Sequence, residues 1–123
     1  MPTMQALVGF GDGMKKMWVG EFEQIVLLAI LQLEDRAYAV PIRRMIDERA
    51  GRRVARGALY TALERLEAKG LVTSRLGEPT PERGGRAKRF FTVTAAGVRV
   101  LRSSKDAMLR LWRGLDSVLG RTP

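Results

Sequence analysis

The chain has 123 residues, 46% of them apolar and 28% charged, and 22 Lys and Arg residues outnumber 13 Asp and Glu residues to give a formal net charge of +9. This length and composition are typical of one folded domain and exclude a disordered tail. The sequence contains neither Cys nor His. Their absence removes disulfides, thiolate nucleophiles, the Ser-His-Asp triad and the commonest metal ligands. We therefore expect a protein that is not an enzyme and that holds no metal or cofactor.

Residues 1–17 are expected to be an extension that precedes the folded domain. They lack the basic and apolar regions of a secretory signal. The longest apolar run, residues 25–31, is well short of the roughly 20 residues that span a bilayer. We therefore expect a cytoplasmic protein with no membrane partner.

The first helix is predicted over residues 21–33, because thirteen residues without a turn signal favour a helix over a buried strand. Apolar side chains occupy nearly every side of this helix, and a helix of this kind is covered on both faces. We expect the domain core to cover one face and a partner subunit to cover the other. Phe22 is included among the expected dimer contacts.

Two further helices follow, joined by a short basic turn. Residues 38–50 are predicted to form the second helix, with Pro41 in its first turn, where the missing N–H costs nothing, and Gly51 as its closing residue. The third helix is predicted from an i, i+3, i+4, i+7 spacing and ends at Gly70. Its apolar residues are Leu59, Ala62, Leu63 and Leu66.

Residues 71–76 and 89–93 alternate like two strands of a hairpin, and a twelve-residue loop joins them, basic and glycine-rich in its second half. Phe90 and Phe91 are adjacent and should therefore face opposite sides of the hairpin. Three helices followed by such a hairpin have the order of a winged helix-turn-helix. The expected fold is mainly α with a small β-hairpin (α+β), and residues 18–93 are the expected DNA-binding domain.

Thr94 is the predicted N-cap of a long last helix. Over about 22 residues this helix would extend roughly 33 Å. Its apolar seam is long for packing on its own domain, which is the plainer alternative, and it indicates a coiled-coil-like dimer interface. Residues 94–123 are therefore the expected dimerisation helix and tail. The seam consists of Leu101, Met108, Leu111, Trp112, Leu115 and Val118.

The positive charge is concentrated on the second helix, the third helix and the hairpin. Residues 36–65 contain eight Arg and three acidic residues, a net charge of +5, and residues 75–89 contain five basic and two acidic residues, a net charge of +3. These two segments hold eight of the nine net charges, which a randomly solvated basic surface would not show. A polyanionic partner, double-stranded DNA, is therefore expected.

Helical geometry selects the candidate DNA contacts on the third helix. With Leu59 facing the core, Gly57 and Thr61 point outward, and Tyr60 and Arg65 flank them. Arginine reads guanine in the major groove, and hydroxyls bind phosphates or bases. In the plainer alternative Tyr60 packs against the turn and Arg65 is only solvated. The expected DNA-binding residues are Tyr38, Arg53, Arg56, Gly57, Tyr60, Thr61, Arg65, Arg83, Arg86, Lys88 and Arg89.

Three segments together resemble the PadR family of transcriptional regulators: GEFEQIVLLAIL (residues 20–31), ALYTALERLEAKGLV (residues 58–72) and GGRAKRFFTVTAAG (residues 84–97). The resemblance covers roughly residues 18–119. It implies a bacterial dimer with a winged helix and a C-terminal dimerisation helix, of a kind that commonly represses genes and releases DNA on binding a small effector. It also implies that Tyr38 and Tyr60 contact phosphates, although Tyr38 is equally compatible with the core.

The chain departs from the family pattern in two places. The second helix begins with Ala37-Tyr38-Ala39 in place of the usual glycines, and Ala55 stands where a capping Ser or Thr is expected. Because the C-terminal region is predicted to form a single helix, we expect no large effector domain, and we expect an effector site at the dimer interface. There Trp18 or Trp112 would stack on a planar ligand, unless both serve only as buried anchors.

Two other functions remain open alternatives to a dimeric repressor on an inverted-repeat operator. A basic nucleoid- or RNA-associated protein would use the same charges without preferring any duplex. A protein-interaction adaptor would dock a partner on the last helix. Selection from random DNA separates the first alternative, and a monomer without DNA affinity would favour the second.

Overall fold

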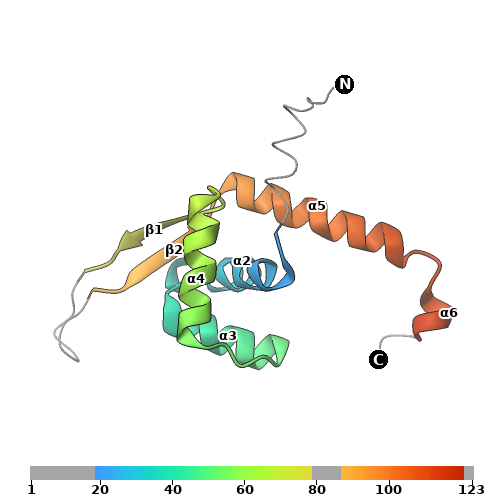
Figure 1. The fold of residues 1–123 in the computed structure, drawn as a ribbon, viewed down its shortest axis with the longest axis horizontal. Coiled ribbons are helices and arrows are strands. Elements are labelled where there is room, and N and C mark those ends of the chain that lie inside the picture. Colours follow the sequence, from blue (N-terminus) through green and yellow to red (C-terminus); the bar gives the residue numbers. More distant parts are fainter. Residues whose placement is uncertain (1–18, 79–86, 121–123) are drawn as a thin grey trace, which may run out of the picture.

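The computed structural model describes residues 19–78 and 87–120. Figure 1 shows three helices packed together, a hairpin that projects beside them, and a long helix that leads away. The predicted mainly helical fold with one small hairpin is confirmed. The elements are α2 (Glu21–Leu33), the 3-10 turn η1 (Glu34–Arg36), α3 (Ala39–Ala50), α4 (Arg56–Ala68), β1 (Val72–Leu76), β2 (Arg89–Val93), α5 (Ala95–Trp112) and α6 (Asp116–Leu119).

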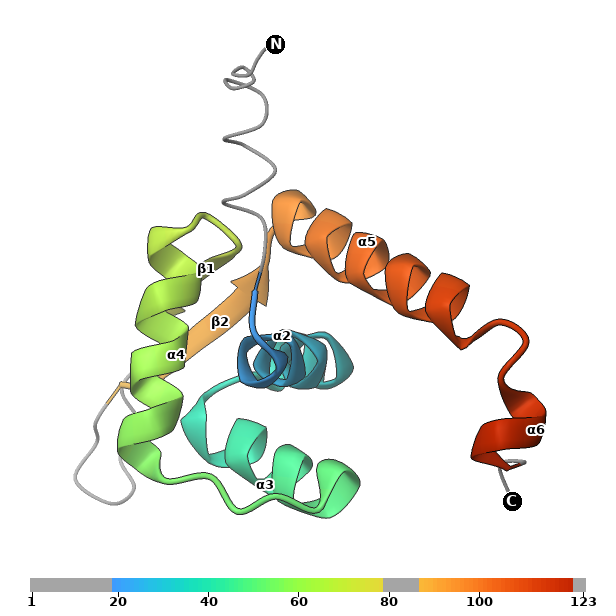
Figure 2. The ribbon, with the colours of Figure 1, turned by 45° about the vertical axis from the view of Figure 1, so that its right-hand side comes forward.

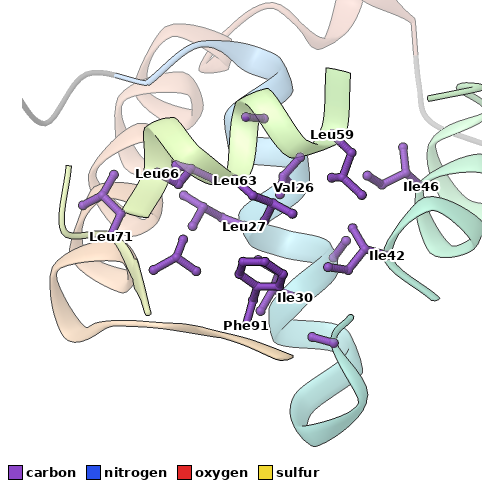
Figure 3. Packing of buried hydrophobic residues seen from close by; sticks show 14 of the residues in the cluster. Val26, Leu27, Ile30, Ile42, Ile46, Leu59, Leu63, Leu66, Leu71 and Phe91 are labelled. Carbon is purple, nitrogen blue, oxygen red and sulfur yellow. The ribbon is translucent and has the colours of Figure 1, made fainter. Parts of the chain in front are cut away.

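Helix α2 is the central element, in contact with α3, α4, α5 and β2. Its bounds are those that the sequence predicts. Its buried side chains form the middle of a single core (Figure 3), because α3, α4 and the hairpin each turn an apolar face toward it. The largest fully buried side chains are Val26, Leu27, Ile30, Ile42, Ile46, Leu59, Leu63, Leu66, Leu71 and Val72.

The turns between the helices follow the predicted signals. Gly51 ends α3 in the left-handed conformation, with φ +67°, and its N–H donates to the carbonyl of Asp47. Gly70, with φ +77°, follows α4 in the same way. Both positions favour glycine because a side chain at positive φ is strained.

The hairpin is antiparallel, and its register pairs Val72 with Val93 and Arg75 with Phe90. Phe91 is buried in the core, whereas Phe90 is only half-buried on the opposite face, as the alternation predicts. The N–H of Phe91 also donates to the carbonyl of Ala37, at 2.8 Å. The hairpin is therefore joined directly to the segment that precedes α3.

The start of α5 is attached to the turn between α4 and β1. Thr94 is the N-cap, and its hydroxyl accepts from the N–H of Gly97 and donates to the carbonyl of Gly70. The predicted cap is thus confirmed. From this point α5 leaves the other helices (Figure 2), and only its first half contributes buried residues, Gly97 and Val100.

The predicted continuous last helix is wrong beyond Trp112. Arg113 is extended, with ψ 132°, and Gly114 has φ +80°, so the chain turns before the short α6 begins at Asp116. Glycine is a poor helix former and enters the left-handed region without strain. Leu115 and Val118 therefore do not extend the α5 seam. The 18 residues of α5 span about 27 Å.

Among the helices of the two described ranges, none is both long enough and apolar enough to cross a membrane.

Candidate nucleic-acid interface

Helix α4 buries one face and exposes the other. Its apolar residues pack on α2 and α3, whereas Gly57, Tyr60, Thr61, Glu64 and Arg65 are all exposed. Tyr60 keeps 43% of its surface accessible. The outward orientation predicted from helical spacing is therefore present, and the ring of Tyr60 is not used to fill the core.

Packing within the chain does not account for the glycine at position 57. A Cβ atom there would meet nothing within 4 Å, and the residue has an ordinary helical backbone. Glycine nonetheless costs a helix interior about 1 kcal/mol relative to alanine. A bare backbone on an exposed helix face allows another molecule to approach closely, which is how the predicted site uses this residue.

Several arginines surround the beginning of α4, and they differ in whether they bind other groups of the chain or are exposed to solvent. Arg43 donates from Nε to the carbonyl of Val54, at 3.0 Å, and so holds the turn between α3 and α4. Arg53 and Arg56 are exposed. Ala55 is the N-cap and provides no side-chain hydrogen bond. The first-turn N–H groups of α4 therefore lack a side-chain acceptor at the cap position.

Two ion pairs join the first turn of α2 to both flanks of α4. Arg52 lies 2.7 Å from Glu21, and Lys69 lies 2.7 Å from Glu23. The first pair is exposed, whereas the Glu23 side chain is only 12% accessible. Arg52 and Lys69 are thus committed to holding α4 in place.

Between α2 and α4 lies an open hollow of about 550 Å³. It brings together three of the predicted DNA-binding residues, Gly57, Thr61 and Arg65. Phe22 lines the same hollow and packs against the core of its own chain. The structure therefore places this predicted dimer contact beside the predicted DNA-binding face of α4.

The base of the hairpin carries a group of rings and cations. The Tyr38 ring stands edge-on to the Phe90 ring, with centroids 5.3 Å apart. Lys88 Nζ lies 5.3 Å from the centroid of Tyr38, and the Arg75 guanidinium lies 4.9 Å from that of Phe90. Tyr38 is half-buried, so it contacts the hairpin and still reaches the surface.

Arg89, another predicted DNA contact, is hydrogen-bonded within the protein. It donates to the hydroxyl of Ser74, which in turn donates to the Glu67 carboxylate, each at 3.0 Å. This chain links β2 through β1 to α4. Arg83 and Arg86, together with Trp18 and the 1–17 extension, lie outside the described residues.

A second apolar region lies on the other side of α2. A groove of about 500 Å³ runs between α2 and α5, lined by Leu28, Leu31, Leu101 and Met108. The predicted seam on α5 continues beyond this groove: Leu111 is 74% accessible and Trp112 is 48% accessible. Leu28 and Leu31 form an open face of α2, so residues 19–78 and 87–120 do not cover α2 on both sides.

Sequence reasoning did not predict that Arg75 and Phe90 join the group of rings and cations at the base of the hairpin. It also did not predict that the two carboxylates of α2 form ion pairs. Arg75 faces Phe90 only in this strand register. Because a twelve-residue loop separates the two strands, local sequence patterns do not predict which residues pair. Glu21 and Glu23 meet partners 31 and 46 positions away in the chain. Within the two described ranges, no group of three acidic residues is arranged to hold a metal ion.

Comparison with known proteins adds a family and a set of related folds. The family model described as the transcriptional regulator PadR-like family matches residues 27–103. A protein described as an uncharacterized 37.1 kDa protein in transposon TN4556 of Streptomyces fradiae is 36% identical over 95 residues. The match covers 77% of this chain and 25% of that protein, so the chain spans about a quarter of its relative.

Solved structures of PadR family transcription regulators share the fold. The protein of Clostridium difficile R20291 superposes with a TM-score of 0.64 at 24% identity, covering 80% of this chain and 99% of that one. The Bacteroides fragilis protein gives 0.64 at 24% identity, covering 89% and 98%. The Eggerthella lenta protein gives 0.59 at 26% identity, covering 79% and 82%.

Proposed function

The chain belongs to the PadR-like family of transcriptional regulators, and we propose that it binds an inverted-repeat operator as a homodimer and represses the adjacent gene. Helix α4 enters the major groove and reads bases with its first two turns. Tyr38 and the hairpin residues contact the sugar-phosphate backbone beside it. Residues 18–93 are the DNA-binding part, and residues 94–123 carry the dimer contacts.

The observation that carries the proposal is the set of arginines around the outer face of α4. Arg53, Arg56 and Arg65 are exposed, and within residues 19–78 and 87–120 none of them has an ion pair or a side-chain hydrogen bond. Exposed guanidinium groups around a bare glycine suit bidentate contacts to guanines and phosphates. Arg43 and Arg52, by contrast, are bound to other groups of the chain, the Val54 carbonyl and the Glu21 carboxylate.

The homodimer rests on the apolar face shared by α2 and α5. Leu28, Leu31, Met108 and Leu111 are more than 40% accessible, and exposed apolar side chains that lie together favour a protein interface. A second copy that covers this face would relate two α4 helices by a twofold axis. Successive major grooves then require the two helices to lie about 34 Å apart.

Release of DNA by a small effector is the finer part of the proposal. The groove between α2 and α5 has the volume of a small-molecule site, and Trp112 adds an exposed ring near the expected dimer interface. A planar, largely apolar effector bound there would change the distance between the two α4 helices. It would then weaken operator binding without touching DNA.

Selection of bound fragments from random duplex DNA tests the function directly. Enrichment of an inverted repeat is expected. With roughly 6 to 10 phosphate contacts, affinity should fall about 10³- to 10⁵-fold between 50 and 200 mM salt in a mobility-shift assay. Salt-dependent binding without any enriched sequence would instead identify a nucleoid- or RNA-associated protein. A monomer that leaves DNA unbound would identify an adaptor.

A further inference from the structure

Four side chains at the base of the hairpin form one continuous series, in which two adjacent rings lie between two cations. Arg75 lies over Phe90, Phe90 meets the edge of Tyr38, and Lys88 lies over Tyr38. They come from β1, β2, the N-cap position of α3 and the residue before β2. The series therefore joins the hairpin to the start of α3.

The backbone on both sides of Phe90 is held in place. Gly77 donates its N–H to the carbonyl of Lys88, at 2.7 Å. A Cβ atom at Gly77 would stand 2.7 Å from Cε1 of Phe90, so the bare backbone of Gly77 makes the room for the ring. On the α3 side, the hydrogen bond from Phe91 to Ala37 fixes the residue just before Tyr38.

Phe90 occupies a position that the core does not require. The neighbouring Phe91 is buried with 4% of its surface accessible and packs in the core cluster. Phe90 is half-buried on the other face, between the Arg75 guanidinium and the Tyr38 ring. A ring in this place orients Arg75 directly and, through the Tyr38 ring that it contacts, also Lys88. Cations that are already oriented lose less conformational freedom when they bind a phosphate.

We propose that Phe90 is a positioning residue for DNA binding, which holds Arg75, Tyr38 and Lys88 as one unit against the phosphate backbone beside the groove that α4 reads. Arg75 thereby becomes an additional phosphate contact. This inference rests on the proposed function of the chain. The inference adds Phe90 to the proposed DNA-binding residues, as the side chain that connects the hairpin to the start of α3.

The test measures the salt dependence of binding to a random-sequence 30-bp duplex, because backbone contacts need no particular sequence. Phe90→Leu is expected to weaken binding about tenfold and to lower the slope of log affinity against log salt by about 2, since each lost phosphate contact removes about one unit. Phe90→Tyr keeps the ring and should restore both values. Thr92→Ala, on the same face of β2, is the matched control and should leave both unchanged.

A double-mutant cycle separates positioning from a loss of stability. Arg75→Gln should lower the slope by about 1 in the wild-type background. In the Phe90→Leu background it should lower the slope by much less, because the cation has already lost its fixed place. Thermal unfolding of each variant gives the folded fraction, so that affinities refer to folded protein only.

Three results would overturn the inference. An unchanged slope in Phe90→Leu, or additive effects of the two substitutions, would leave the proposed function intact and remove the role of Phe90. A wild-type chain that binds no duplex would remove both. In the free protein, NMR then shows whether the Arg75 side-chain protons still carry a ring-current shift from Phe90, which tests the packing separately from DNA binding.

Discussion

Gly97 lies so close to the main-chain carbonyl of Leu71 that a Cβ atom at position 97 would stand 2.5 Å from that oxygen and 2.6 Å from Cγ1 of Val93. The same carbonyl accepts a hydrogen bond from the N–H of Thr94, at 2.9 Å. The first turn of α5 is therefore pressed against the turn that follows α4. The direction in which α5 leaves the domain depends on this contact.

Gly97→Ala is expected to destabilise the protein, because the added methyl group meets backbone that has little freedom to move. Overpacking of this kind costs about 1 to 3 kcal/mol, measurable as a lower urea midpoint with an unchanged slope of the unfolding free energy. Gly57→Ala is the matched control, since it makes the same chemical change in open space. Equal midpoints for the two variants would contradict the close packing of α5.

Gly57→Ala should separate stability from DNA binding. Replacing an exposed helical glycine by alanine is expected to raise the free energy of unfolding by about 0.5 to 1 kcal/mol. In the same variant, affinity for the selected duplex should fall by about fivefold or more, because the methyl group occupies the place where the groove wall approaches. Ser103→Ala, on the exposed surface of α5, provides the control. A stabilised variant with unchanged affinity would show that DNA does not approach at position 57.

Local patterns predict most of this fold but not all of its contacts. The cap at Thr94 and the glycines at positions 51 and 70 involve neighbours within a few residues, so the sequence alone indicates them. The break at Gly114 is different, because the apolar spacing of Leu111 and Leu115 continues through it and favours an unbroken helix. In that case a single glycine outweighs a periodic pattern whose side chains at Leu111 and Leu115 remain exposed.

In the candidate site, too, some features follow from local sequence patterns and others depend on tertiary contacts. The outward face of α4 follows from the period of a helix once its buried residues are known. The contact between Tyr38 and Phe90 joins residues 52 positions apart in the printed sequence, and it depends on the hairpin register. Which arginines form ion pairs within the protein also depends on the tertiary structure. Arg52 pairs with Glu21, whereas the adjacent Arg53 has no ion pair among the described residues.

The two ion pairs of α2 should differ in their contribution to stability. Glu21→Gln breaks an exposed pair, and such pairs contribute at most about 1 kcal/mol. Glu23→Gln breaks the pair with Lys69. Because the Glu23 carboxylate is largely buried, this change should lower the free energy of unfolding more than Glu21→Gln does. Chemical unfolding of Glu21→Gln and Glu23→Gln, at low and high salt, compares the two pairs. Adding Lys69→Gln and Glu23→Gln/Lys69→Gln gives the coupling between Glu23 and Lys69. A larger effect at Glu21 would contradict the burial pattern.

Leu111→Glu tests the proposed homodimer, because Leu111 is the most accessible leucine on α5 whose exposure is described. A charge there has little to disturb within the subunit, but it would be buried without a partner when a second copy covers the helix. The dimer dissociation constant should therefore rise by about 100-fold or more. Sedimentation measured over a range of protein concentrations gives this constant.

Operator binding adds a second measurement to the same variant. Affinity for the full inverted repeat should fall with the loss of the dimer, while affinity for a half-site should stay near that of the wild type, because α4 and the hairpin are unchanged. Arg102→Gln, an exposed position on the same helix, should leave both assembly and binding intact. If Leu111→Glu remained a dimer with full operator affinity, the exposed face of α5 would have to serve a different partner, and the α2 face around Leu28 and Leu31 would become the place to look for the twofold contact.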